Sequence, residues 1–187
     1  MDIEELKMPG CLKIHPKIVR DARGEFVKPF VENEYRDRGL RTDFVEEYYS
    51  RSKTGVLRGL HFQTPPYEYY KVVTCLDGRI RDVIVDLRAG SPTFGQCQAL
   101  ELDARDGWLL YLPPGIAHGF LVLNKSALVL YKVTRIYASE YDAGILWNSV
   151  PVDWGVKTPL ISPRDAAFPA LVNFATPFVF APNQVQQ

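Results

Sequence analysis

The stretch "GWLLYLPPGIAHGF", residues 107–120, decides the fold expected for this chain. Two apolar runs, Gly107–Leu112 and Gly119–Leu123, are separated by a segment that contains Pro-Pro-Gly. Runs of this length that are rich in Leu, Val and aromatic residues are typical of β-strands, and proline and glycine are typical of the turns between them. The stretch therefore predicts two strands joined by a turn, with His118 close to the second.

The same rhythm continues through the chain in both directions. Thirteen glycines and 14 prolines divide 187 residues into short apolar runs, which indicates an all-β sandwich or barrel. The other expected strands are Glu25–Val31, Phe44–Arg51, Val56–Phe62, Tyr69–Leu76, Arg79–Leu87, Gln96–Leu102 and Ala127–Arg135. "LDGRI" (76–80) predicts a tight hairpin, "VENEYRDRG" (31–39) a short helix, and the proline-rich sequence from Val150 an irregular tail around the body.

Composition is that of an ordinary globular protein, with 47% apolar and 24% charged residues. We expect one domain over residues 1–187, with its core at about 21–171. Lys and Arg total 22, as do Asp and Glu, so no net charge favours nucleic acid or membrane as a partner. Three cysteines without C-x-x-C spacing argue against disulfides and structural zinc. With no signal sequence or membrane-spanning run evident, we expect a cytoplasmic protein.

A second stretch, "GVLRGLHFQTPPYEYYK" (55–71), holds Arg58, His61 and Lys71 in a strand-like context where unpaired polar groups are costly. Strict alternation would put Arg58 and His61 on opposite faces of the strand. They can serve one site only if the strand is irregular, and Gly59 is where a bulge costs least. In "ALVLYKVT" (127–134), the same alternation turns Tyr131 inward and Lys132 outward.

Two segments resemble the motifs of the cupin fold, a double-stranded β-helix or jelly roll. Residues 107–118 are similar to the second motif, and Gly55, His61, Gln63 and Glu68 follow the first, with Gln63 where a histidine is usual. His61, Glu68 and His118 are thus candidate ligands for Fe or Mn. Histidines satisfied within a core are the structural alternative.

Seven fragments in order resemble the dTDP-4-dehydrorhamnose 3,5-epimerase family, from about Asp21 to Leu171. They are "DARGEF", "GVLRGLHFQ", "DVIVDLRAGSPTFG", "LPPGIAHGFLVL", "LYKVTRIY", "ILWN" and "LISPRD". The resemblance implies an all-β, cupin-like jelly roll with short helices that needs no metal or other cofactor. It also implies a nucleotide-sugar substrate and a homodimer with exchanged N-terminal strands.

By motif position, the resemblance implies four catalytic residues. His61 is the general base, Asp165 the carboxylate that orients it, Tyr131 the acid on the other face of the sugar, and Lys71 the donor to the enolate oxygen. A hydrogen-bonded carboxylate fixes the tautomer of an imidazole. A neutral tyrosine still holds its proton at pH 7.

Substrate-binding positions are implied as well, and several depart from the family pattern. The expected contacts are Arg23, Lys28, Glu46, Tyr48, Arg58, Gln63, His118, Tyr137, Asp142 and Arg164. Lys28 reverses the charge of a family glutamate. Glu46 and Tyr48 replace the Gln and the Asn of the family's Q-x-N-x-S pattern. We expect the epimerase chemistry with a changed base, sugar or number of epimerised carbons. A metal-dependent cupin enzyme and an inactive sugar-binding cupin remain alternatives.

Overall fold

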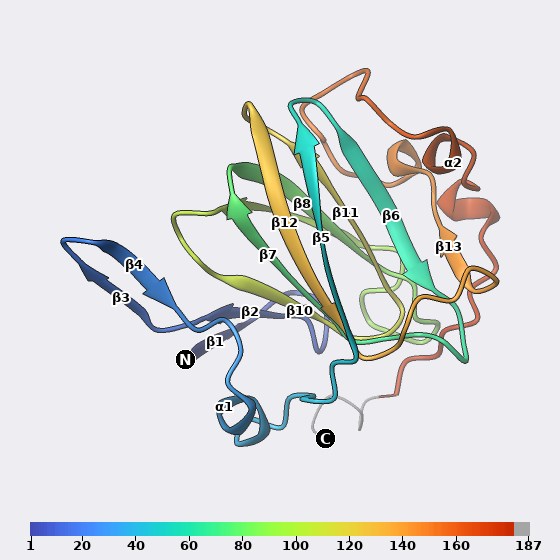
Figure 1. Cartoon of the computed structure of the whole chain (residues 1–187). Helices are drawn as coiled ribbons and strands as arrows, with labels where there is room; N and C mark the ends of the chain where they lie inside the picture. The colour runs from blue at the N-terminus through green and yellow to red at the C-terminus, as the bar shows by residue number, and fades with distance from the viewer. Residues whose placement is uncertain (182–187) are drawn as a thin grey trace.

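The computed structural model describes residues 1–181, and two β-sheets packed face to face form its body (Figure 1). The first sheet has, in spatial order, β1 (Asp2–Glu5), β2 (Leu12–His15), β10 (Leu109–Leu112), β7 (Lys71–Asp77), β12 (Ser126–Val133) and β5 (Glu46–Lys53). The second has β13 (Asp142–Gly144), β6 (Leu57–Gln63), β11 (Ile116–Val122), β8 (Arg79–Asp86) and β9 (Cys97–Asp103). This is the expected jelly roll.

The space between the sheets is filled by side chains that alternate along each strand. In β12, Ala127, Val129, Tyr131 and Val133 are buried, while the residues between them are partly exposed. Tyr131 therefore points inward as expected, and Lys132 pairs with Glu47 on the other face. Period-2 burial of this kind is what fixes the register of a strand.

A second apolar layer covers the outer face of the five-stranded sheet. Leu57, Leu60, Phe62 and other outward residues of that sheet pack against Trp154 and Phe178 of the C-terminal segment. The segment from Val150 is irregular, as expected, with short helices at α2 (Pro163–Ala166) and η2 (Leu171–Asn173). Residues 182–187 of the expected tail lie outside the described residues. Because both faces of this sheet are covered, all seven residues of β11 are buried.

All nine expected strands overlap an observed strand, but the N-terminal region holds more structure than expected. β1 and β2 extend the six-stranded sheet beside β10. β3 (Ile18–Asp21) and β4 (Gly24–Val27) form a separate two-stranded hairpin that extends away from the body (Figure 1). The expected short helix is present as α1 (Glu32–Arg36), with η1 (Trp147–Ser149) the remaining helical turn. None of the helices in residues 1–181 has the length and apolarity to span a bilayer.

The prediction of a hairpin at "LDGRI" is wrong. Gly78 makes the expected sharp turn, with φ of +83°, but β7 and β8 lie in different sheets and do not pair. A Cβ at Gly78 would lie 2.0 Å from the Ser126 carbonyl oxygen, so the turn is packed against the start of β12. The Asp-Gly pair therefore turns the corner between the two sheets.

Candidate active site

The irregularity expected at Gly59 is present, and it brings Arg58 and His61 to one face of β6. Between β6 and β11 the register pairs His118 with His61 but Phe120 with Arg58, so β6 holds one extra residue. Gly59 has φ of +125°, a conformation that suits glycine. Leu57 and Leu60 consequently share the outer apolar layer, while Arg58 and His61 line the space between the sheets.

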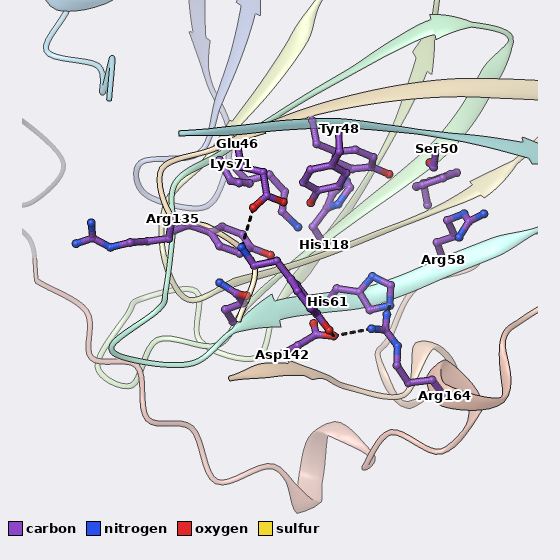
Figure 2. Close-up of a pocket in the computed structure, with 16 residues that line it drawn as sticks. Glu46, Tyr48, Ser50, Arg58, His61, Lys71, His118, Arg135, Asp142 and Arg164 are labelled. Atoms are coloured by element: carbon purple, nitrogen blue, oxygen red, sulfur yellow. Dashed lines mark hydrogen bonds and ion pairs between the residues drawn. The ribbon is translucent and has the colours of Figure 1, made fainter. Parts of the chain in front are cut away.

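That space contains a cavity of about 350 Å³. Its lining includes most of the expected site residues, namely Glu46, Tyr48, Arg58, His61, Gln63, Lys71, His118, Tyr131, Tyr137, Asp142 and Arg164. In Figure 2, Tyr48 and Ser50 of β5 lie across the cavity from His61 of β6 and Asp142 of β13. The two sheets therefore supply opposite walls.

His61 is held against Asp165, as expected. Its Nε2 lies 2.9 Å from Asp165 Oδ2, and the backbone N–H of Gly59 donates to the same oxygen at 3.0 Å. Ser162 caps α2 by accepting from the Asp165 N–H at 3.1 Å. Burial raises the pKa of the Asp165 carboxyl, but the contacts with His61 and with the Gly59 N–H outweigh it and hold that pKa well below its usual value. Asp165 is therefore an ionised partner for the imidazole.

Tyr131 lies in the opposite wall, on β12, and its ring is fixed by two neighbours. The Tyr48 ring stacks on it with centroids 4.8 Å apart, and the His118 ring meets it edge-on at 6.2 Å. Burial raises the pKa of Tyr131 far above its ordinary value. It raises the pKa of Tyr48 to about 12. Both phenols keep their protons at neutral pH.

Three polar residues are buried together with Tyr131. His118 Nε2 lies 2.7 Å from Asp82 Oδ2, and neither side chain is more than 3% exposed. Lys71 is also buried, and burial lowers the pKa of its ammonium to about 8 although Asp82 and Asp142 raise it. Burial likewise lowers the pKa of His118, against the opposing effect of Asp82. This part of the cavity thus offers one buried ammonium that is still mostly charged at neutral pH.

A chain of contacts runs along the outer part of the cavity. Glu46 Oε2 accepts from the Tyr137 backbone N–H at 2.8 Å, and the Tyr137 hydroxyl donates to Asp142 Oδ2 at 3.2 Å. Arg164 donates to the same Asp142 oxygen at 2.5 Å. These contacts hold Tyr137 and Arg164 in place at the edge of the cavity.

Two expected binding residues lie outside the cavity, and a third is engaged by the backbone. Arg23 and Lys28 are not part of this cavity. Arg23 donates to Asp21 at 2.6 Å on the β3–β4 hairpin, and the Lys28 ammonium lies 6.0 Å from the Phe26 ring centroid. Gln63 lines the cavity, but its amide bonds to the backbone of Tyr67, Ile136 and Ala138.

The alternative metal-ligand set is not brought together. Glu68 lines a different cavity, of about 780 Å³, whereas His61 and His118 are each in contact with an aspartate. Within residues 1–181, no three His, Cys, Asp or Glu side chains converge as metal ligands.

The cavity also includes residues that the expected set left out. Ser50, Tyr69 and Arg135 line it, and Asp82 lies behind His118. Tyr69 and Ser50 could have been found from the family pattern, because Tyr69 stands where a glutamine is usual and Ser50 keeps the serine of Q-x-N-x-S. Asp82 gave no such signal, since only the three-dimensional structure pairs it with His118.

Comparisons with known proteins agree with this geometry. Residues 5–173 match the family described as dTDP-4-dehydrorhamnose 3,5-epimerase. The dTDP-4-dehydrorhamnose 3,5-epimerase of Shigella flexneri is 39% identical over 168 residues, which is 88% of this chain and 93% of that protein.

Two solved structures are also similar. RmlC of Legionella pneumophila, a dTDP-6-deoxy-D-glucose-3,5-epimerase in complex with dTDP-4-keto-L-rhamnose, is 36% identical with a TM-score of 0.91, over 96% of this chain and 99% of that one. ChmJ, a 3'-monoepimerase from Streptomyces bikiniensis in complex with dTDP-quinovose, is 30% identical with a TM-score of 0.84, over 89% and 86%. The match over most of the chain and the shared fold show that this protein belongs to the dTDP-4-dehydrorhamnose 3,5-epimerase family.

Proposed function

We propose that this protein epimerises C3, C5 or both in a 4-keto-6-deoxy hexose linked to a nucleoside diphosphate, as a cytoplasmic enzyme of deoxysugar biosynthesis. The observation that carries the proposal is the placement of two proton carriers on facing sheets. The His61–Asp165 pair is on β6 and α2, and Tyr131 is on β12. Inversion needs a carrier on each face of the sugar, because a single carrier would tend to return the proton to its original side.

The first step is removal of a proton from a carbon next to the C4 ketone. His61 takes this proton with the ring nitrogen that does not contact Asp165. The ionised Asp165 stabilises the imidazolium that forms, and it keeps the ring oriented through the Nε2 contact at 2.9 Å.

The electrons left by that proton move onto the C4 oxygen, which becomes an enolate. Lys71 is the proposed donor to this oxygen, because it is buried and lines the same cavity. One well-placed donor in a dry site can lower such a barrier by roughly 3–4 kcal/mol. Its pKa of about 8 leaves it mostly protonated at neutral pH.

Tyr131 completes the reaction by delivering its proton to the carbon from the opposite face. The raised pKa of its phenol keeps the proton in place until a strongly basic enolate carbon is present. After one cycle His61 carries a proton and Tyr131 has lost one, so exchange with water restores both groups.

The outer cavity suits an anionic nucleotide. Arg58, Arg135 and Arg164 line it together with the exposed ring of Tyr137, and we propose that Tyr137 stacks on the base and the arginines contact the diphosphate. We also propose a homodimer with exchanged N-terminal strands. The projecting β3–β4 hairpin supports it, since it carries Arg23 and Lys28 outside the chain's own cavity.

Deuterium exchange tests the proposed reaction. The purified protein is incubated in D2O with dTDP-, CDP- and GDP-linked 4-keto-6-deoxy sugars, and the products are read by NMR. We expect deuterium at C3, C5 or both with at least one substrate. No exchange with any of them would contradict the epimerase assignment.

A further inference from the structure

Two side chains of opposite charge approach the same nitrogen of His61. An Nη2 atom of Arg164 lies 2.8 Å from His61 Nε2, and Asp165 Oδ2 lies 2.9 Å from it. A guanidinium can only donate hydrogen bonds, and an ionised carboxylate can only accept them. Nε2 therefore cannot satisfy both, because it presents either a lone pair to Arg164 or a hydrogen to Asp165.

The two possibilities differ in what the other ring nitrogen can do. A neutral imidazole carries one N–H. If Nε2 accepts from Arg164, the hydrogen is on Nδ1 and no lone pair is left for a substrate proton. If Nε2–H donates to Asp165, the Nδ1 lone pair is free. Only the second tautomer is a general base.

We propose that Arg164 is a positioning residue that holds His61 in the tautomer unable to act as a base while the cavity is empty, and releases it when an anionic nucleotide binds. This inference rests on the function proposed above. It concerns how the tautomer of His61 is controlled, and it takes the role of His61 as the general base from that function.

Arg164 is held beside His61 by three further contacts. It donates to Asp142 Oδ2 at 2.5 Å through one terminal nitrogen and to Asp165 Oδ1 at 3.1 Å through Nε. The Phe168 ring lies 5.6 Å from the guanidinium carbon and 5.7 Å from the centroid of the His61 ring. Phe168 therefore packs against both members of the pair and keeps them adjacent.

The same arginine is within reach of the substrate. About half of its side chain is exposed, and it lines the cavity that the substrate would enter. A diphosphate offers paired anionic oxygens that match the geometry of the guanidinium. Its charge-assisted hydrogen bonds with Arg164 would be stronger than the one that Arg164 makes with a neutral imidazole nitrogen. When Arg164 turns to the diphosphate, Nε2 loses its donor. Nδ1 then gives its proton to water while Nε2 takes one from water, and Asp165 accepts the new Nε2–H.

Nitrogen-15 NMR of the imidazole rings reads the tautomer directly, and the chain has only three histidines. His118 is an internal reference, because its Nε2 lies 2.7 Å from Asp82 and we expect that nitrogen to stay protonated throughout. For His61 we expect the hydrogen on Nδ1 in the free protein and on Nε2 after saturation with dTDP. The Arg164→Met variant should show Nε2–H without dTDP.

Arg135→Met is the matched control, since Arg135 also lines the cavity and has no contact with His61 among the described residues. It should keep the wild-type tautomer in the free protein. Nε2–H in free wild-type protein, or an unchanged tautomer after addition of dTDP or in Arg164→Met, would overturn the inference. Deuterium exchange into the sugar tests the epimerase function separately, so failure of one can be told from failure of the other.

Discussion

Gly59 lies directly against Gly119 across the β6–β11 pair: a Cβ added at Gly59 would come within 2.5 Å of the Gly119 Cα. It would also lie 2.9 Å from the His118 carbonyl oxygen. The extra residue of β6 at this point turns Arg58 and His61 to the same side, and the two glycines allow the backbones to approach closely enough for it.

We expect Gly59→Ala to destabilise the protein and to reduce activity. A side chain in this conformation costs about 1–2 kcal/mol, and the backbone clash adds about 1–3 kcal/mol. Urea unfolding measures the change in free energy. Gly55→Ala is the control, since Gly55 also has positive φ but faces open space. Equal losses in the two variants would show that the contact with Gly119 does not matter.

Tyr131→Phe should separate proton removal from inversion. His61 can still remove a proton and return one from D2O on the same face, so we expect deuterium to enter the sugar while inversion falls by about 10²–10⁴-fold. The fold should persist because the stacking ring is kept. NMR of the product gives both quantities.

Tyr49→Phe is the matched control, because Tyr49 lies on β5, the strand that pairs with β12, and its side chain is largely exposed. It should behave like the wild type. His61→Ala should lose both exchange and inversion. Normal turnover in both His61→Ala and Tyr131→Phe would refute the assigned roles.

Lys71 predicts an alkaline limit to activity. Burial lowers the pKa of its ammonium to about 8, so the group is charged below that pH and neutral above it. If the charged form stabilises the enolate, the turnover rate should fall as the pH rises through about 8. Lys71→Met should lose about 10²–10³-fold at neutral pH. A rate that stays constant from pH 7 to 10 would argue against this role.

Asp82→Asn tests whether the charge of Asp82 sets the alkaline limit through Lys71. Asp82 raises the pKa of Lys71 through its negative charge, so its neutralisation should move the alkaline limit to lower pH. An effect through misplacement of His118 alone would lower the rate without moving the limit. The pH profile therefore distinguishes the two effects.

Most of the strands could be predicted from sequence because their signals are local. Alternation in "ALVLYKVT" gave the direction of Tyr131 correctly, and glycine in an otherwise apolar run indicated the bulge at Gly59. In contrast, "DIEE" of the edge strand β1 and "LKIH" of its neighbour β2 carry charged residues, and β13 is three residues long. β2 and β13 pair with β10 and β6, which are far away in the chain, and β1 in turn pairs with β2; local patterns do not report such distant partners.

The candidate site also has a part that the sequence predicted and a part that it did not. The structure places three residues named by the motifs, His61, Lys71 and Tyr131, in one cavity, and it places Asp165 against His61. The motifs did not indicate that β7 and β8 lie in different sheets, so Asp82 could not be placed beside His118. Nor could spacing along the chain reveal that Arg164 and Asp165 approach one nitrogen of His61. Such relationships arise from packing between distant segments.

The β3–β4 hairpin supports the last prediction, that the protein is a dimer whose assembly depends on this hairpin. Val19 and Phe26 of the hairpin are 49% and 61% exposed, and burial of the exposed half of such side chains against a second copy would stabilise the assembly by about 1 kcal/mol each. Phe26→Asp should therefore shift the protein toward the monomer in light scattering. Activity should fall with it if Arg23 and Lys28 complete the partner's cavity.

Val172→Asp is the control, because Val172 is 89% exposed on η2 and its replacement should leave the assembly intact. A monomeric wild-type protein with full activity would contradict the exchange of N-terminal strands.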